Sequence, residues 1–162
     1  MNVVNRRHPE RIRMMSFRRP TISKDNIFYH HDLRSLAFTF ASKGLSVGVV
    51  QPMIMEFQFD QYCPKQSNEA VLLFTAQKQD FERMNRVAKE NQLKTNALII
   101  WGGKHDDMPQ SDDFPVLSVQ QINDKKGMLN WHDLCEMATM PPQNTEQPNV
   151  QAKKPLWKRL FG

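Results

Sequence analysis

The feature that most constrains the fold is a pair of short apolar runs separated by one amphipathic segment. Residues 70–76 read AVLLFTA, a nearly continuous apolar run that is typical of a strand buried on both faces. Residues 96–101 read NALIIW and form a second run of this kind. Between them, Asp80 begins a segment whose apolar residues recur at helical spacing: Phe81, Met84, Val87 and Ala88. A helix here is the crossover that parallel pairing needs, so the two strands are predicted to be parallel.

Further elements are predicted on both sides of this unit. Residues 32–43 are expected to form a helix, because Asp32 is a suitable N-cap and Gly44 is a suitable left-handed stop. Residues 45–50 are expected to form a buried strand. Residues 53–60 alternate between apolar and polar side chains, which indicates a second strand or a continuation of the first beyond a bulge. Two more elements are predicted later in the chain: a short edge strand over 115–119 and a helix that begins at Asn130 with an N-x-x-D cap.

These elements predict an α/β domain of three layers, with a mixed, mostly parallel sheet of about four to five strands and flanking helices. The 162 residues have room for one domain. We expect four regions: a basic flexible arm over 1–26, the α/β domain over 27–140, a disordered linker over 141–154 and an amphipathic tail peptide over 155–162. The alternative for the tail, which reads PLWKRLFG, is a closing helix packed on the domain.

Positive charge is concentrated at the two ends of the chain. The net charge is +5, and residues 1–24 contain seven basic residues against one acid, whereas residues 141–162 contain four against one. Residues 25–140 contain 11 basic and 15 acidic side chains, a net charge of −4. Phosphates are therefore expected to meet the ends rather than the folded body. The arm is the predicted anion-binding or nucleic-acid-binding segment, through six arginines that suit bidentate contacts: Arg6, Arg7, Arg11, Arg13, Arg18 and Arg19.

The tail peptide is the second candidate binding segment. Its apolar and cationic side chains suit docking into a partner groove or shallow insertion at an anionic membrane surface. Because so short a peptide gives only marginal membrane affinity alone, a protein partner in a larger assembly, or avidity through the arm, is favoured. The residues expected to contact that partner are Leu156, Trp157, Lys158, Arg159, Leu160 and Phe161.

The sequence predicts a compartment as well as partners. Its apolar runs are far shorter than the roughly 20 residues that span a bilayer, and it shows no secretory signal. We therefore expect a cytoplasmic protein, with a peripheral position at the inner membrane face as the alternative that the tail leaves open. Cys63 and Cys135 are expected to be free thiols, because two cysteines make no disulfide framework in a reducing compartment.

The densest group of reactive side chains lies in residues 102–113. Gly102 to Asp107 follow the second predicted strand at its carboxyl end, where open α/β sheets bind ligands, and Asp112 and Asp113 come shortly after. Carboxylates with His105 would suit a metal ion, but a solvated acidic loop is the favoured interpretation. The sequence contains no specific catalytic, cofactor-binding or metal-binding motif, so no catalytic residue, cofactor or metal site is predicted.

Asp60 ends one predicted strand, and Ala76-Gln77-Lys78 ends the next. In these positions, and in the order of elements over residues 30–138, the chain resembles the core of restriction-endonuclease-like nucleases. In that family an acid on one strand and a Glu-x-Lys pair on the next bind the metal ion and orient the attacking water. The resemblance carries over Lys78 but not the acid before it, and a divalent cation needs that second carboxylate. The resemblance thus implies a related fold without nuclease activity.

Charge segregation is the strongest functional signal. We expect a non-enzymatic adaptor or accessory subunit of a larger assembly, whose basic arm and tail engage nucleic acid or another anionic partner. Two alternatives are kept open. One is a metal-dependent nuclease or phosphoesterase that uses Asp60, Lys78 and the acidic loop. The other is a protein-docking module that acts through its C-terminal peptide at a membrane-associated complex.

Overall fold

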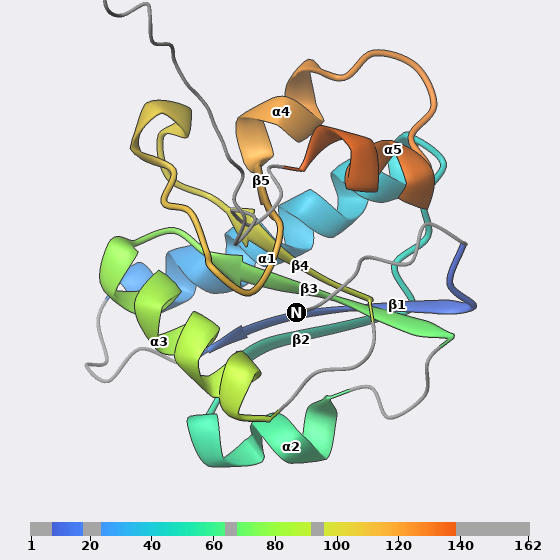
Figure 1. Ribbon diagram of the computed structural model, residues 1–162. Helices are drawn as coiled ribbons and strands as arrows, with labels where there is room; N and C mark the ends of the chain where they lie inside the picture. Colours follow the sequence, from blue (N-terminus) through green and yellow to red (C-terminus); the bar gives the residue numbers. More distant parts are fainter. Residues whose placement is uncertain (1–7, 18–23, 64–67, 92–95, 139–162) are drawn as a thin grey trace, which may run out of the picture.

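The computed structural model describes residues 8–17, 24–63, 68–91 and 96–138, whose strands form one sheet (Figure 1). Within these described residues the sheet has five strands in the order β2-β1-β3-β4-β5, and every neighbouring pair is parallel. The α/β class is therefore confirmed, and the sheet is all-parallel rather than mixed. The strands are β1 (Arg11–Phe17), β2 (Val49–Ile54), β3 (Glu69–Thr75), β4 (Asn96–Trp101) and β5 (Val116–Ser118).

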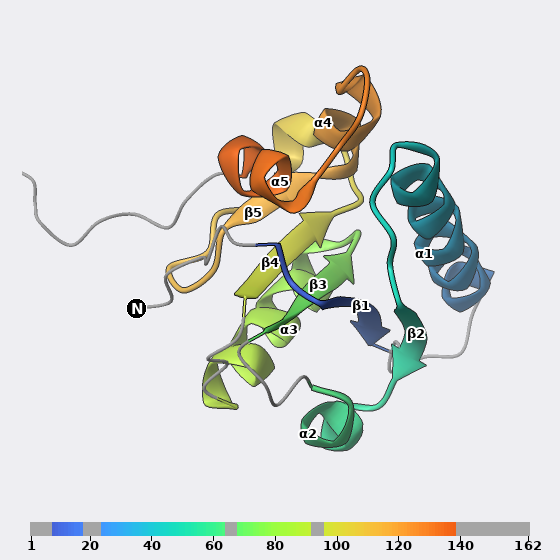
Figure 2. The same ribbon diagram turned by 90° about the vertical axis from the view of Figure 1, so that its right-hand side faces the viewer.

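Helices cover both faces of the sheet, which gives the three layers of a doubly wound fold (Figure 2). One face packs against α1 (Lys24–Ser42), α4 (Val119–Asp124) and α5 (Trp131–Met137). The other face packs against α2 (Phe59–Tyr62) and α3 (Lys78–Glu90). Two 3-10 turns, η1 (Glu56–Gln58) and η2 (His105–Asp107), follow β2 and β4. No helix in the described ranges is long and apolar enough to cross a membrane.

The central strands are apolar on both sides because both sides are covered. Along β3, Leu72 and Phe74 pack into the core on the α1 face, whereas Val71 and Leu73 pack into the core on the α3 face. All four of these side chains are buried. The predicted strands over 70–76 and 96–101 are thus confirmed, and they pair in parallel from Ala70 with Asn96 onward.

The first strand departs from the expectation of a flexible arm over residues 1–26. Residues 11–17 form β1, which pairs with β2 on one side and with β3 on the other. Met14 and Met15 are fully buried on opposite faces. Arg11 is exposed at the start of the strand, and Arg13 is half-buried. Two arginines thus interrupt an apolar strand, and their charge concealed its pattern in the sequence.

The alternating segment 53–60 is not a strand over most of its length. β2 continues through Pro52 to Ile54, because β2 lies at the sheet edge, where a proline is tolerated. A bulge follows Pro52: Met53 has φ of +54°, and its N–H donates to Ser16 Oγ at 3.1 Å. Residues 56–62 then form η1 and α2. Phe59 is buried there while Phe57 is 80% exposed, so the alternation of these aromatics did not reflect strand pairing.

Two helix ends have the capping geometry that the sequence predicted: the start of α5 and the end of α1. At the start of α5, Asp133 N donates to Asn130 Oδ1 at 2.9 Å and Asn130 N donates to Asp133 Oδ2 at 3.2 Å, as the N-x-x-D pattern predicted. α1 ends at Ser42, and Gly44 has φ of +94°, which confirms the left-handed stop. α1 begins earlier than Asp32, at Lys24, and α4 was not predicted.

Candidate functional site

Doubly wound folds bind ligands at the carboxyl edge of the sheet, so a site is expected at that edge. The described connections at this edge follow β2, β3, β4 and β5, and the strand arrows in Figure 1 point toward it. Residues 76–77 join β3 to α3, and residues 102–107 follow β4. The sequence prediction of reactive side chains at the carboxyl end of β4 is therefore correct in its position.

Two hydrogen bonds hold the loop after β4, one to the end of β3 and one between Trp101 and the loop itself. Gly102 N donates to Thr75 O at 2.6 Å, and the indole Nε1 of Trp101 donates to Lys104 O at 2.7 Å. A Cβ at Gly102 would lie 2.6 Å from Phe74 Cζ, and a Cβ at Gly103 would lie 2.7 Å from Trp101 Cζ2. Both glycines are needed because the loop crosses close to these rings. Packing, rather than a phosphate-binding geometry, explains the Gly-Gly pair.

His105 joins this loop to the start of α4. Its Nδ1 lies 2.8 Å from Ser118 Oγ. The same hydroxyl accepts from Gln121 N at 3.1 Å, and Ser118 N donates to Gln121 Oε1 at 2.9 Å, which completes a capping box. Because Ser118 is fully buried, its hydroxyl cannot meet a substrate in this arrangement. The His105–Ser118 contact fixes the loop to the helix and gives no accessible nucleophile.

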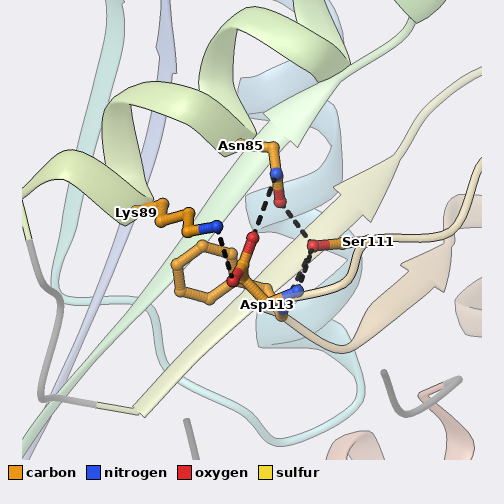
Figure 3. Close-up of polar contacts among 5 residues, drawn as sticks. Asn85, Lys89, Ser111 and Asp113 are labelled. Atoms are coloured by element: carbon orange, nitrogen blue, oxygen red, sulfur yellow. Dashed lines mark hydrogen bonds and ion pairs between the residues drawn. The ribbon is translucent and has the colours of Figure 1, made fainter. Parts of the chain in front are cut away.

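The two acidic pairs of the loop lie in different surroundings. Asp106 and Asp107 are exposed on η2. Asp113 instead contacts α3: its carboxylate lies 3.6 Å from Lys89 Nζ and 3.5 Å from Asn85 Nδ2 (Figure 3). Within the described part of the chain, no group of three or more His, Cys, Asp or Glu residues is placed to hold a metal ion.

The residues that the nuclease resemblance matched are not on strands. Asp60 lies in α2, and Lys78 is the first residue of α3, so they belong to two different helices. Ala76 and Gln77 form the turn between β3 and α3. The strand positions from which that family presents its acid and its Glu-x-Lys pair thus have no counterpart at these residues.

A groove that the sequence did not predict lies between α1 and α4, above the carboxyl ends of β3 and β4. Its volume is about 200 Å³. Leu36 and Phe74 are buried, whereas Ser35 and Asn123 are exposed. The lining contains no charged side chain and combines aliphatic, aromatic, hydroxyl and amide groups: Ser35, Leu36, Thr39, Phe74, Gly102, Val119 and Asn123. Sequence spacing gives no signal for this groove, since its walls come from segments about 80 residues apart.

The predicted binding arginines divide into two groups. Arg11 and Arg13 belong to β1 and are therefore parts of the sheet, not of a flexible arm. Arg6, Arg7, Arg18 and Arg19 lie outside the described residues, as does the whole tail peptide from Leu156 to Phe161. Chain connectivity still separates the outer arginines: Arg6 and Arg7 precede β1, and Arg18 and Arg19 follow it.

Comparison with known proteins adds no family to this geometry. No protein-family model matches the chain, and searches of curated proteins and of solved structures find no significant match. Function therefore has to be inferred from the residues of this chain.

Proposed function

We propose that this chain is a non-enzymatic accessory subunit whose basic segments bind nucleic acid while its α/β body contacts a protein partner. One observation carries the proposal. Residues 1–7 and 139–162 contain six basic side chains and one acid, a net charge of +5, whereas residues 8–138 contain 16 basic and 16 acidic side chains and are neutral. A phosphate backbone is therefore attracted by the two ends of the chain more than by the body on average.

The character of these charges supports phosphate contact. Three of the six basic residues at the ends are arginines, and the pair Arg18 and Arg19 follows β1; planar guanidinium groups bind phosphate oxygens in pairs. Contacts of this kind position a protein on the backbone and carry little base information. We therefore expect binding that is salt-sensitive and tolerant of sequence.

β1 divides the segment that was expected to be one basic arm into a part before the strand and a part after it. A strand of seven residues spans about 23 Å, and Arg6 and Arg7 precede β1 in the chain whereas Arg18 and Arg19 follow it. We therefore expect two arginine sites, one connected to each end of β1, in place of one contiguous patch.

The nuclease alternative lacks comparable support. It required Asp60, Lys78 and the acidic loop to act together, and they lie on α2, on α3 and beyond β4. The peptide-docking alternative depends on residues outside the described ranges and is addressed by the tail variant below.

Fluorescence anisotropy with a labelled oligonucleotide, single-stranded and duplex, tests the proposal over a range of salt concentrations. The variant R6A/R7A/R18A/R19A should weaken binding. The slope of log K against log salt is negative, and its magnitude should fall by about 3 to 4, since each lost phosphate contact reduces it by about 0.9. The pairs R6A/R7A and R18A/R19A, made separately, show which side of β1 contributes. The tail variant K153A/K154A/K158A/R159A measures the second segment.

The matched control removes four cations from the described body, in the variant R34A/R86A/K104A/K126A. These side chains are exposed, so their removal should leave the fold intact and the salt slope nearly unchanged. Equal losses in the control and in the arginine variant would contradict the proposal. Absence of wild-type binding at low salt would also contradict it, as would binding to anionic vesicles in preference to the oligonucleotide.

A further inference from the structure

The side chains that line the groove between α1 and α4 indicate what kind of group can bind there. Its buried floor, Leu36 and Phe74, is apolar, and its rim carries the hydroxyl of Ser35 and the amide of Asn123. The lining has no charged group to hold a phosphate or a carboxylate. At about 200 Å³ it is smaller than the roughly 300 to 1,000 Å³ of sites for drug-sized ligands. A single aromatic side chain with a hydrogen-bond donor fits this description.

The described part of the chain ends next to α4, one of the two helices that form the groove. The carbonyl of Met137, at the end of α5, accepts from Gln121 Nε2 at 3.1 Å. Gln121 lies on α4, the helix that contributes Val119 and Asn123 to the groove, but on the opposite side of that helix, since it is two residues from each. Residues 139–162 therefore start from a point tied to the helix that forms one wall of the groove, on the side of that helix away from the groove.

We propose that Trp157 of this chain occupies the groove between α1 and α4, so that the tail peptide docks on the body of its own molecule. The indole supplies an aromatic face for Leu36 and Phe74 and one N–H donor for the polar rim. Lys158 and Arg159 follow directly in the sequence. Asp124, which is exposed and adjacent to Asn123 in the sequence, supplies an acid on the helix that forms one wall.

The length of the connection favours docking within one molecule. Seventeen residues, 138–154, separate α5 from the peptide. A random coil of this length would have a root-mean-square span of about 22 Å, which is ample for a site on the neighbouring helix. The local concentration of the peptide is then on the order of 1 mM, so an intrinsic Kd of about 0.1 mM keeps roughly nine molecules in ten docked. Docking needs no tight intrinsic affinity.

Bimane fluorescence in the full-length chain tests this contact, because an indole in contact quenches the dye. The label is attached to the thiol that the substitution Ser35→Cys introduces at the groove rim; the native thiols, Cys63 and Cys135, are buried and react slowly. Replacing Trp157→Leu in the same labelled chain should raise the bimane emission several-fold. Trp101 and Trp131 are present in both chains, so any quenching that they cause is the same in both and does not affect the comparison.

Three controls make the result decisive. A label at Gln120→Cys, exposed and outside the lining, should respond in the same direction even if a label at position 35 obstructs the rim. A label at Glu82→Cys, exposed on α3 on the other face, should not respond. Val119→Glu should release the tail as Trp157→Leu does.

Equal emission with and without Trp157 at both labelled positions would overturn the inference. A difference that disappears on dilution would overturn it too, since it would assign the peptide to a second copy of the chain. The assay contains no nucleic acid, so its outcome is independent of the proposed function.

Discussion

Ser111 holds the long connection between β4 and β5 with one buried hydroxyl. Only 3% of the residue is exposed. Its Oγ donates to Asn85 Oδ1 on α3 and accepts from the N–H groups of Asp113 and Phe114, both at 3.0 Å (Figure 3). The connection between β4 and β5 contains no α-helix, so few of its backbone N–H groups are paired within it. The Ser111 hydroxyl supplies hydrogen bonds that a crossover helix would otherwise make within its own backbone.

Replacing Ser111→Ala should lower the free energy of unfolding by about 2 kcal/mol, because two backbone N–H groups and the Asn85 amide lose a buried partner. Urea denaturation followed by circular dichroism measures the change. The control Ser46→Ala removes an exposed hydroxyl and should stay within about 0.5 kcal/mol of the wild type. Equal stabilities of the two variants would show that the hydroxyl contributes little.

At the scale of elements, the turns that end and join the helices depend on backbone conformations that glycine adopts easily. Gly44 follows α1 with φ of +94°, and Gly127 joins α4 to α5 with φ of +82°. The two turns are close in space, since Leu129 N donates to Lys43 O at 2.8 Å. α1 is thereby tied to the α4–α5 connection on the same face of the sheet. This contact holds together the two helices that form the groove walls.

Gly44→Ala and Gly127→Ala should each lower the free energy of unfolding by about 1 to 2 kcal/mol, because an L side chain is strained at these φ values. A Cβ at Gly127 would meet nothing within 4 Å, whereas a Cβ at Gly44 meets the side chain of Met128, which is 71% exposed and able to move. Gly48→Ala is the control: it has no positive φ and should change stability by no more than about 0.5 kcal/mol. A larger loss at Gly48 than at Gly44 would contradict the assignment of strain.

At the scale of the whole molecule, β1 connects the two apolar cores. Ile12 and Met14 belong to the core under α1, and Met15 and Phe17 belong to the core under α3. Each buried side chain of this size contributes about 1.5 to 3 kcal/mol, so the four together rival the roughly 5 to 15 kcal/mol that stabilise a typical domain. The strand that resembled a charged arm is thus required for both layers.

Deleting residues 1–7 should leave the melting temperature nearly unchanged, whereas deleting residues 1–17 should prevent folding, because the sheet then lacks an interior strand. Circular dichroism and thermal melts of the two truncated chains measure the difference. A cooperative melt of the shorter chain near the wild-type temperature would show that β1 is dispensable. The milder variant Met14→Ala, expected to cost about 2 to 5 kcal/mol, tests the same point in a chain that still folds.

Local sequence determined the elements whose pattern is set by nearest neighbours. The apolar strands β3 and β4, the amphipathic α3 and the capped start of α5 follow from composition, spacing and capping residues. The segregation of positive charge is likewise a property of the sequence alone.

Tertiary structure decided what depends on distant partners. β1 is a strand because β2 and β3 pair with it on either side despite its arginines. The alternation after Ile54 is helical because, among the described residues, no strand lies beyond β2 at the sheet edge to pair with it. The groove between α1 and α4 exists only when segments far apart in the chain pack on one face, since burial of both helices against the sheet, rather than any local pattern, brings their side chains together.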